Sequence, residues 1–371
     1  MLYFLTLLTV IAGPWITGMG NNGFSVTWTT EDESLGWVQL EDGRRIYEEF
    51  AGRRFHSKYH HVRVDGVPEG CKLTYTIGVN DVLDKTDPYR PKYDTDRVEG
   101  TYAVNTFSSK KKTCRFSVIN DIHKNVSRYS KLVKQIDTLK TDFIFLNGDV
   151  AQAGHYTLDS LVKYEIGPLG RYSAIMPLFF ARGNHEGRGN GIVNVSSVFQ
   201  NDGRTPTADP DLPFTYMFRE GPAAFIVFDS GETGPRNSMG FCGKPLYEDY
   251  LLKQLEWAKE AFKSAEWRSA KVKICILHAP MVDPGIPDDY VVHTWMNHNM
   301  GPALNKAGVD LMIGADLHEY FFYPAGSMGN NYPIIVNDDM SRLETCVSGK
   351  DITVTIFGDN GESRCVYSTK Q

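Results

Sequence analysis

The chain has 371 residues, a formal net charge of −6 and a hydrophobic content of 42%. This length and composition exclude a disordered chain and allow two globular domains. The acidic balance argues against nucleic-acid binding, and the only basic cluster, residues 110–112, lies in a predicted linker.

Residues 2–12 are apolar, but the first basic residue is Arg44, so the usual basic start of a signal peptide is missing. The run is also too short to span a membrane. We expect it to form a first β-strand or to be the remnant of a trimmed leader. No other part of the sequence predicts a transmembrane segment.

Alternation of apolar and polar residues predicts short strands in the first third of the chain. The pattern is clear in residues 24–30 (FSVTWTT), and it returns in residues 35–40, 60–67 and 72–79 with turn residues between them. This spacing predicts a small all-β sandwich domain over residues 1–108.

The pattern changes at about residue 113, where apolar strands begin to alternate with helical stretches. Helices are predicted over residues 127–140 and 247–265. Two late strands without a helix between them, in residues 332–338 and 350–359, indicate a mixed sheet or a two-sheet sandwich. We therefore predict an α/β domain over residues 113–371.

The six cysteines have no zinc-type spacing. Cys275 lies in an apolar strand and is expected to be a small buried side chain. Cys346 and Cys365 could face each other across C-terminal strands.

Polar residues follow the predicted strands of the α/β domain, where metal and substrate sites of such folds form. They are Asp121, His123, Asn147, Asp149, Asn184, His185, His278, Asp316 and His318. Each has a structural alternative, such as a helix cap, a turn or a hydrogen-bonded core histidine. Independent caps and turns would not keep falling at the same sheet edge, so we favour a metal site, and these ligand types suit Zn, Mn, Fe or similar ions.

The ordered elements DIH, NGD, RGNHE, LHAP and GADLH resemble the motifs of calcineurin-like metallophosphoesterases over residues 113–340. With the preceding β-rich segment, the chain resembles the purple acid phosphatase branch, which carries a fibronectin-III-like N-terminal domain. The resemblance implies a mixed β-sandwich flanked by helices.

The resemblance also implies two divalent metal ions, of which Mn, Zn, Fe and Mg are the candidates. One ion would be held by Asp121, His123, Asp149 and His318, and the other by Asp149, Asn184, His278 and Asp316. Such a pair of ions activates a hydroxide and neutralises phosphate oxygens. His185 would assist the leaving group or bind a phosphoryl oxygen.

Two positions depart from the family pattern. Gln152 stands where purple acid phosphatases have a metal-binding tyrosine, so the iron–tyrosinate colour is not expected. His155 could approach the site, although a surface role is the simpler interpretation. Asp316 stands where the family usually has histidine; a carboxylate favours harder ions such as Mn or Mg, and a non-ligand aspartate is the alternative.

The predicted function is hydrolysis of a phosphate ester, with a phosphorylated small molecule or another phosphoester as substrate. The alternatives are a phosphodiesterase acting on nucleotides or phospholipid head groups, and a metal-binding recognition protein with impaired catalysis. His293 and His298 are weaker candidates for substrate contacts. The family resemblance favours a secreted or periplasmic protein.

Overall fold

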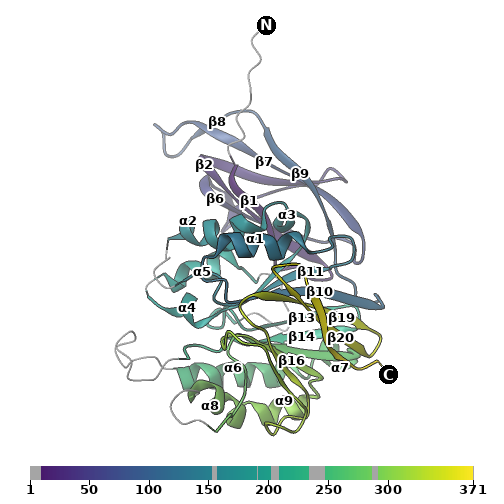
Figure 1. Cartoon of the computed structure of the whole chain (residues 1–371). Helices are drawn as coiled ribbons and strands as arrows, with labels where there is room; N and C mark the ends of the chain where they lie inside the picture. Colours follow the sequence, from purple (N-terminus) through teal and green to yellow (C-terminus); the bar gives the residue numbers. More distant parts are fainter. Residues whose placement is uncertain are drawn as a thin grey trace.

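The computed structural model of the chain describes residues 10–152, 157–189, 191–201, 209–233, 247–285 and 291–370. Figure 1 shows an all-β region at the N-terminal end and an α/β region beyond it. This is the architecture predicted from the sequence. The strands of the first region are β1 (Val10–Thr17), β2 (Gly23–Leu40), β3 (Arg45–Tyr47), β4 (Glu49–Phe50), β5 (Arg53–Arg54), β6 (Ser57–Asp65), β7 (Lys72–Asp84), β8 (Lys92–Tyr93) and β9 (Arg97–Asn105).

Strand β2 connects the two halves of the all-β region. Its first half pairs with β1 and β6, and its second half pairs with β3 and β7. The register with β6 shifts between Thr29 and Ser34, where Glu31 and Asp32 are exposed. A bulge of this kind bends a strand, so one long strand serves two groups of partners.

The α/β region contains two six-stranded sheets. The first has the order β12-β11-β10-β19-β20-β21 and the second has the order β13-β14-β15-β16-β18-β17. The strands are β10 (Thr113–Ile119), β11 (Phe143–Asn147), β12 (Leu178–Ala181), β13 (Tyr216–Glu220), β14 (Ala223–Val227), β15 (Val272–Ile276), β16 (Leu311–Gly314), β17 (Phe321–Tyr323), β18 (Ile334–Val336), β19 (Ser341–Ser348), β20 (Asp351–Gly358) and β21 (Ser363–Ser368).

Helices cover the outer faces of the two sheets (Figure 1). They are α1 (Val126–Lys134), α2 (Leu158–Leu161), α3 (Tyr172–Ile175), α4 (Asn184–Gly187), α5 (Ile192–Val198), α6 (Tyr247–Ala261), α7 (Ala265–Ser269), α8 (Val291–Asn299) and α9 (Gly301–Ala307), with a π-helical turn η1 (Val162–Ile166) and a 3-10 turn η2 (Gly167–Leu169).

Successive side chains of the central strands point alternately into the core between the two sheets and into the cores beneath the helices. Phe116 and Phe143 of the first sheet and Phe225 of the second belong to the core between the sheets. Their neighbours Ile144 and Ile226 face outward into cores built with the helices. Because successive side chains of a strand point to opposite faces, an entirely apolar strand fills both layers.

Both predicted helices are longer than the observed ones. The first ends at Lys134, and the Asp137 side chain then accepts a hydrogen bond from the Leu139 backbone N–H in a turn. The second is divided into α6 and α7, because Ser264 caps a new helix by accepting from the Trp267 N–H. Short polar side chains compete in this way with continued helix.

The predicted facing of Cys346 and Cys365 is wrong. Strand β20 lies between β19 and β21, which carry these two cysteines, and neither thiol is bonded to another cysteine of the described residues. Cys275 is buried, as predicted. No helix in the described ranges has the length and apolar character needed to cross a membrane.

Candidate metal centre

The candidate site lies where the carboxyl ends of both sheets meet. Strands β10, β11 and β12 run parallel in the first sheet, and β15 and β16 run parallel in the second. The predicted ligands follow these strands directly: Asp121 and His123 after β10, Asp149 after β11, Asn184 after β12, His278 after β15, and Asp316 and His318 after β16.

Many of these side chains are presented from an unusual backbone conformation. Positive φ angles outside glycine occur at Ala51 and, in or beside the site, at Asp121, His123, Lys124, Asp149, Asp316 and His318. Such angles are uncommon for residues with a Cβ atom and cluster at functional sites. The strand ends are therefore bent to aim polar side chains at a common point.

Two glycines of the sequence motifs allow the strand ends to approach each other. A Cβ atom on Gly148 would lie 2.5 Å from His278 Nδ1, and one on Gly183 would lie 2.1 Å from Asp149 Oδ1. Gly148 also has a φ of +79°. Neither position has room for a larger residue, which explains the glycine in NGD and in RGNHE.

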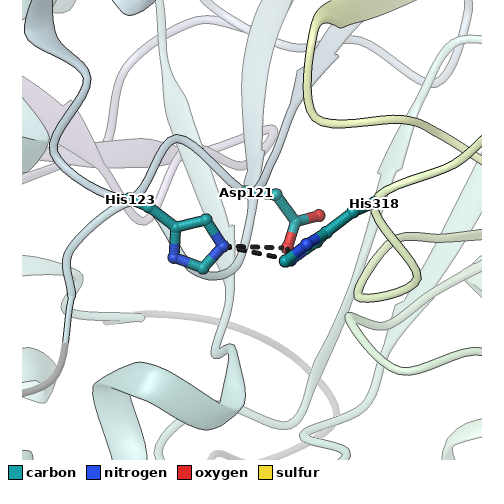
Figure 2. Close-up of side chains that lie close together, drawn as sticks. All are labelled: Asp121, His123 and His318. Atoms are coloured by element: carbon teal, nitrogen blue, oxygen red, sulfur yellow. Dashed lines mark hydrogen bonds and ion pairs between the residues drawn. The ribbon is translucent and has the colours of Figure 1, made fainter.

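Asp121, His123 and His318 form one group of potential ligands (Figure 2). Nε2 of His318 lies 3.3 Å from Asp121 Oδ1 and 3.1 Å from His123 Nε2. Asp121 is buried, whereas the His318 side chain is 51% exposed. The group therefore has an open side toward solvent.

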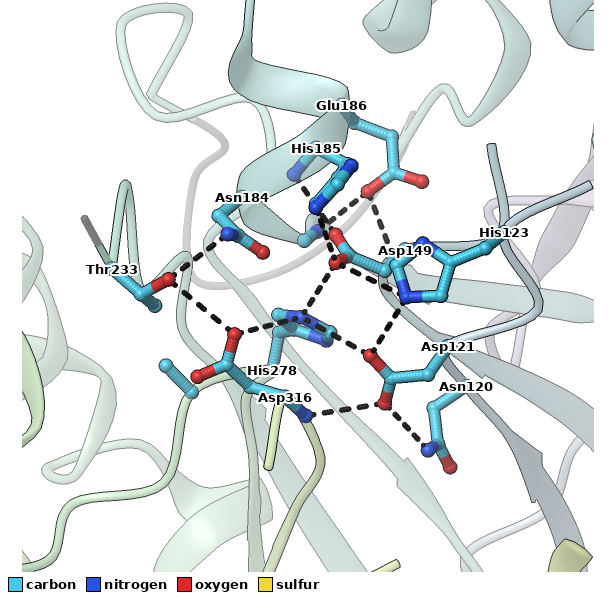
Figure 3. A network of polar contacts seen from close by, with 12 residues as sticks. Asn120, Asp121, His123, Asp149, Asn184, His185, Glu186, Thr233, His278 and Asp316 are labelled. Atoms are coloured by element: carbon cyan, nitrogen blue, oxygen red, sulfur yellow. Dashed lines mark hydrogen bonds and ion pairs between the residues drawn. The ribbon is translucent and has the colours of Figure 1, made fainter. Parts of the chain in front are cut away.

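His278 Nε2 lies at the centre of a second group, which Figure 3 shows beside Asp121 and His123. Its distances are 3.5 Å to Asp149 Oδ2, 3.6 Å to Asp316 Oδ1 and 3.9 Å to Asp121 Oδ1. His278 Nδ1 lies 2.7 Å from the Asn147 backbone oxygen. That bond places a proton on Nδ1 and leaves the Nε2 lone pair of the neutral ring for a metal ion.

Asn184 and His185 begin the short helix α4 beside Asp149. The Asp149 carboxylate accepts a hydrogen bond from the His185 backbone N–H at 2.9 Å. His185 Nε2 lies 3.7 Å from Asp149 Oδ2, and Arg188 Nη1 lies 3.0 Å from the same ring nitrogen. Because an arginine only donates, this contact makes Nε2 the acceptor and puts the ring proton on Nδ1.

Without a metal ion, the buried carboxylates and histidine of the site shift one another's pKa values. Burial is the largest influence and raises the pKa of Asp121 and Asp149. The combined effect of His278 and other neighbouring groups is greater, so the pKa of each carboxyl falls below its usual range. Burial lowers the pKa of His278, but Asp149 and Asp121 hold it well above its ordinary value. A proton on His278 thus balances carboxylates that a metal ion would otherwise balance.

Two details fit a cation between these groups. Asp121 Oδ1 is buried and accepts no hydrogen bond from the part of the chain that the structure describes. The Asn184 amide is best hydrogen-bonded in the protein alone with its nitrogen toward Asp149, at 3.1 and 3.0 Å from the two carboxylate oxygens. The opposite orientation aims the amide oxygen at the carboxylate, as a shared metal ion requires.

Two supporting residues, Asn120 and Thr233, were missed in the sequence, whereas Glu186 belongs to the RGNHE element. Asn120 donates to Asp121 Oδ2 at 2.8 Å, and Thr233 Oγ1 lies 2.9 Å from the Asn184 amide nitrogen. Glu186 accepts from the Asp149 and Gly183 N–H groups, and burial together with Asp149 raises its pKa to about 7. Asn120 directly precedes the DIH element, which is a usable signal; nothing in the sequence marked Thr233.

The remaining candidates lie in different surroundings. His293 is buried, with Nε2 2.9 Å from Asp316 Oδ2. His298 is exposed, and its Nε2 lies 2.9 Å from Asp283 Oδ2. Gln152 is exposed, and His155 lies outside the described residues.

Comparison with known proteins agrees with this geometry. The family model of calcineurin-like phosphoesterases matches residues 114–320. No curated protein matches the chain.

Two solved structures share the fold. Purple acid phosphatase PPD1 from yellow lupin (Lupinus luteus) seeds has a TM-score of 0.68 and 13% identity, over 96% of this chain and 73% of that one. GAP50, the anchor in the inner membrane complex of Plasmodium, has a TM-score of 0.50 and 18% identity, over 70% of this chain and 89% of that one. At these identities the likeness concerns the fold alone.

Proposed function

The chain belongs to the calcineurin-like phosphoesterase family, and from that premise we propose that two divalent metal ions at the strand ends enable it to hydrolyse a phosphate ester. The observation that carries the proposal is the convergence of carboxylate oxygens and imidazole nitrogens from both sheets. The enzyme class, a phosphoesterase hydrolase, follows from the family. The number of ions and the residue roles below are the proposal.

Asp121, His123, Asp149 and His318 would hold one ion, and Asp149, Asn184, His278 and Asp316 would hold the other. Asp149 would bridge the pair, since its carboxylate lies between His278 and the His123 side of the site. Two ions in such a site acidify water to a nucleophilic hydroxide and neutralise charge on the phosphoryl oxygens. Mn, Zn, Fe and Mg all accept this mixture of oxygen and imidazole ligands.

His185 would bind the substrate beside the ions. Its burial lowers its pKa, so the ring is neutral near pH 7. Nε2 faces Arg188, whereas Nδ1 is buried and has no hydrogen-bond partner among the described residues. A buried Nδ1 does not reach a substrate, whereas Nε2 lies 3.7 Å from Asp149 Oδ2 at the site. Nε2 would therefore contact a phosphoryl or leaving-group oxygen, and this requires Arg188 to move away.

The test uses the metal-stripped protein reloaded with Mn, Zn, Fe or Mg, assayed on an aryl phosphate monoester and on a diaryl diester. Asn184→Ala and His185→Ala should each lower kcat/KM by about 100-fold or more while the fold persists by circular dichroism. Asn299→Ala is the control, because Asn299 is exposed and its side chain donates to the Trp295 backbone oxygen within α8.

Unchanged rates in both site variants would refute the assignment. Preference for the diester would favour the phosphodiesterase alternative. Tightly bound metal without turnover of either ester would instead support a metal-binding recognition protein, for which the substitution at Asp316 is the motivating feature.

A further inference from the structure

The two oxygens of Asp316 face different partners. Oδ1 lies 3.6 Å from His278 Nε2, and Thr233 Oγ1 lies 3.4 Å from it. Oδ2 lies 2.9 Å from His293 Nε2. Figure 3 shows Asp316 between His278 and Thr233, on the side of the site contributed by the second sheet. One oxygen thus faces the metal site, and the other is bound away from it.

The spacing of Oδ1 suits a metal ligand. Two ligand atoms at ~2.1 Å from one ion lie roughly 3.0–3.4 Å apart at the usual coordination angles. His278 Nε2 lies 3.6 Å from Asp316 Oδ1 and 3.5 Å from Asp149 Oδ2, slightly wider than this range. A small contraction around an ion would bring the three atoms to bonding distance.

His293 is held in place by its helix. It lies on α8, whose Met296 is buried in the core between the second sheet and its covering helices. The His293 side chain is itself 2% exposed. A buried donor on a packed helix fixes the carboxylate that accepts from it more firmly than an exposed side chain or water would.

We propose that His293 is a positioning residue that fixes Asp316 as a single-oxygen ligand of the second metal ion. The inference rests on the proposed two-ion function. The resemblance places a histidine where this chain has Asp316, and a carboxylate there can rotate, bind through both oxygens or withdraw to solvent. The hydrogen bond from His293 Nε2 to Oδ2 removes those options and leaves Oδ1 directed at His278.

The experiment measures metal affinity directly. Metal-stripped full-length wild type, His293→Leu and His293→Gln are titrated with Mn²⁺, and bound ions are counted by elemental analysis after dialysis and by Mn²⁺ electron paramagnetic resonance. His293→Leu should weaken binding of the second ion by about 10–100-fold and leave the first unchanged. His293→Gln keeps an N–H donor at similar reach and should recover part of the loss.

The same substitution made in the Asp316→Asn variant tests whether His293 acts through Asp316. In Asp316→Asn the carboxylate is gone, so adding His293→Leu should cause little further loss of affinity. His60→Gln is the matched control, because buried His60 also faces a carboxylate, with Nδ1 3.3 Å from Glu48 Oε2, but in the N-terminal region. It should not change Mn²⁺ affinity.

The outcomes are distinguishable. Two ions and hydrolysis in wild type with unchanged second-ion affinity in both His293 variants would overturn the positioning role and leave the proposed function intact. A rise in KM without loss of metal would also overturn it, in favour of substrate contact. A wild type that binds no second ion would overturn both proposals.

Discussion

Arg188 joins several polar residues of the site through one guanidinium. Its Nε and Nη2 lie 3.0 and 2.9 Å from the two carboxylate oxygens of Glu232, and its Nη1 contacts His185. Glu232 is nearly fully buried, whereas the Arg188 side chain is 29% exposed. A two-pronged contact of this kind fixes direction as well as charge, so Arg188 sets the ring orientation of His185.

Replacing Arg188 should therefore affect both stability and activity. Arg188→Ala leaves Glu232 buried without its cation, which should cost about 1–3 kcal/mol in the free energy of unfolding. It should also lower kcat/KM by about 10–100-fold, because His185 loses its fixed orientation. Denaturant unfolding and steady-state kinetics measure the two effects.

Arg54→Ala is the matched control, since it breaks an exposed ion pair with Glu49. Such a pair contributes little to stability. If Arg188→Ala behaved like Arg54→Ala in both measurements, the orienting role would be wrong.

At the scale of elements, the sequence placed the candidate ligands at the sheet edge because each follows a recognisable strand. Asp121, Asp149 and His278 need only a short apolar run before them to be placed at a sheet edge. The residues that orient the ligands could not be found in this way. Arg188 meets Glu232, and Asp316 meets His293, through contacts between separate loops and helices whose packing no local pattern specifies.

The segment that joins the all-β region to β10 is tied to the end of β13. Glu220 accepts from the Ser108 N–H at 2.9 Å and from Lys111 Nζ at 3.0 Å. Burial raises the pKa of Glu220 to about 7, against a usual value of 4.5. At a pH between these two pKa values, the Glu220 carboxyl is protonated in the folded chain and ionised in the unfolded chain.

This difference in protonation makes the free energy of unfolding decrease as the pH rises. The folded state binds more protons, so the contribution of Glu220 to stability is complete below pH 4.5 and is lost as the pH rises to about 7. The loss should be about 3 kcal/mol, and Glu220→Gln should remove it. Urea unfolding of both proteins from pH 4.5 to 8 tests this; parallel pH profiles would contradict it.

At the scale of the whole molecule, the two regions share a boundary with buried hydrogen bonds. Trp15 Nε1 donates to the Val198 backbone oxygen at 2.8 Å, and Tyr75 Oη donates to that of Ala174 at 2.7 Å. Ile16 also forms a bridge with Pro177. Because these contacts combine burial with satisfied polar groups, the regions should not separate before they unfold.

Trp15→Ala should weaken the whole structure. It leaves a cavity and an unpaired carbonyl, and it should lower the free energy of unfolding by about 3–5 kcal/mol. Differential scanning calorimetry should show one transition in wild type. Tyr89→Ala, at an exposed aromatic, should leave the melting temperature nearly unchanged. Two separate wild-type transitions, with Trp15→Ala moving only one, would contradict this prediction.

The left-handed backbone at the ligand positions also bears on how such a site can change during evolution. Asn, Asp and His tolerate this conformation better than most residues with a Cβ atom, and they are also good metal ligands. Asp316 has a φ of +68° and His318 a φ of +59°. Exchange among these residue types therefore leaves the turns intact while it alters which metal they prefer. Apart from glycine, the residues that this backbone accepts most readily are metal-ligand types, so an exchange among them keeps the candidate site and changes its preference for a metal ion.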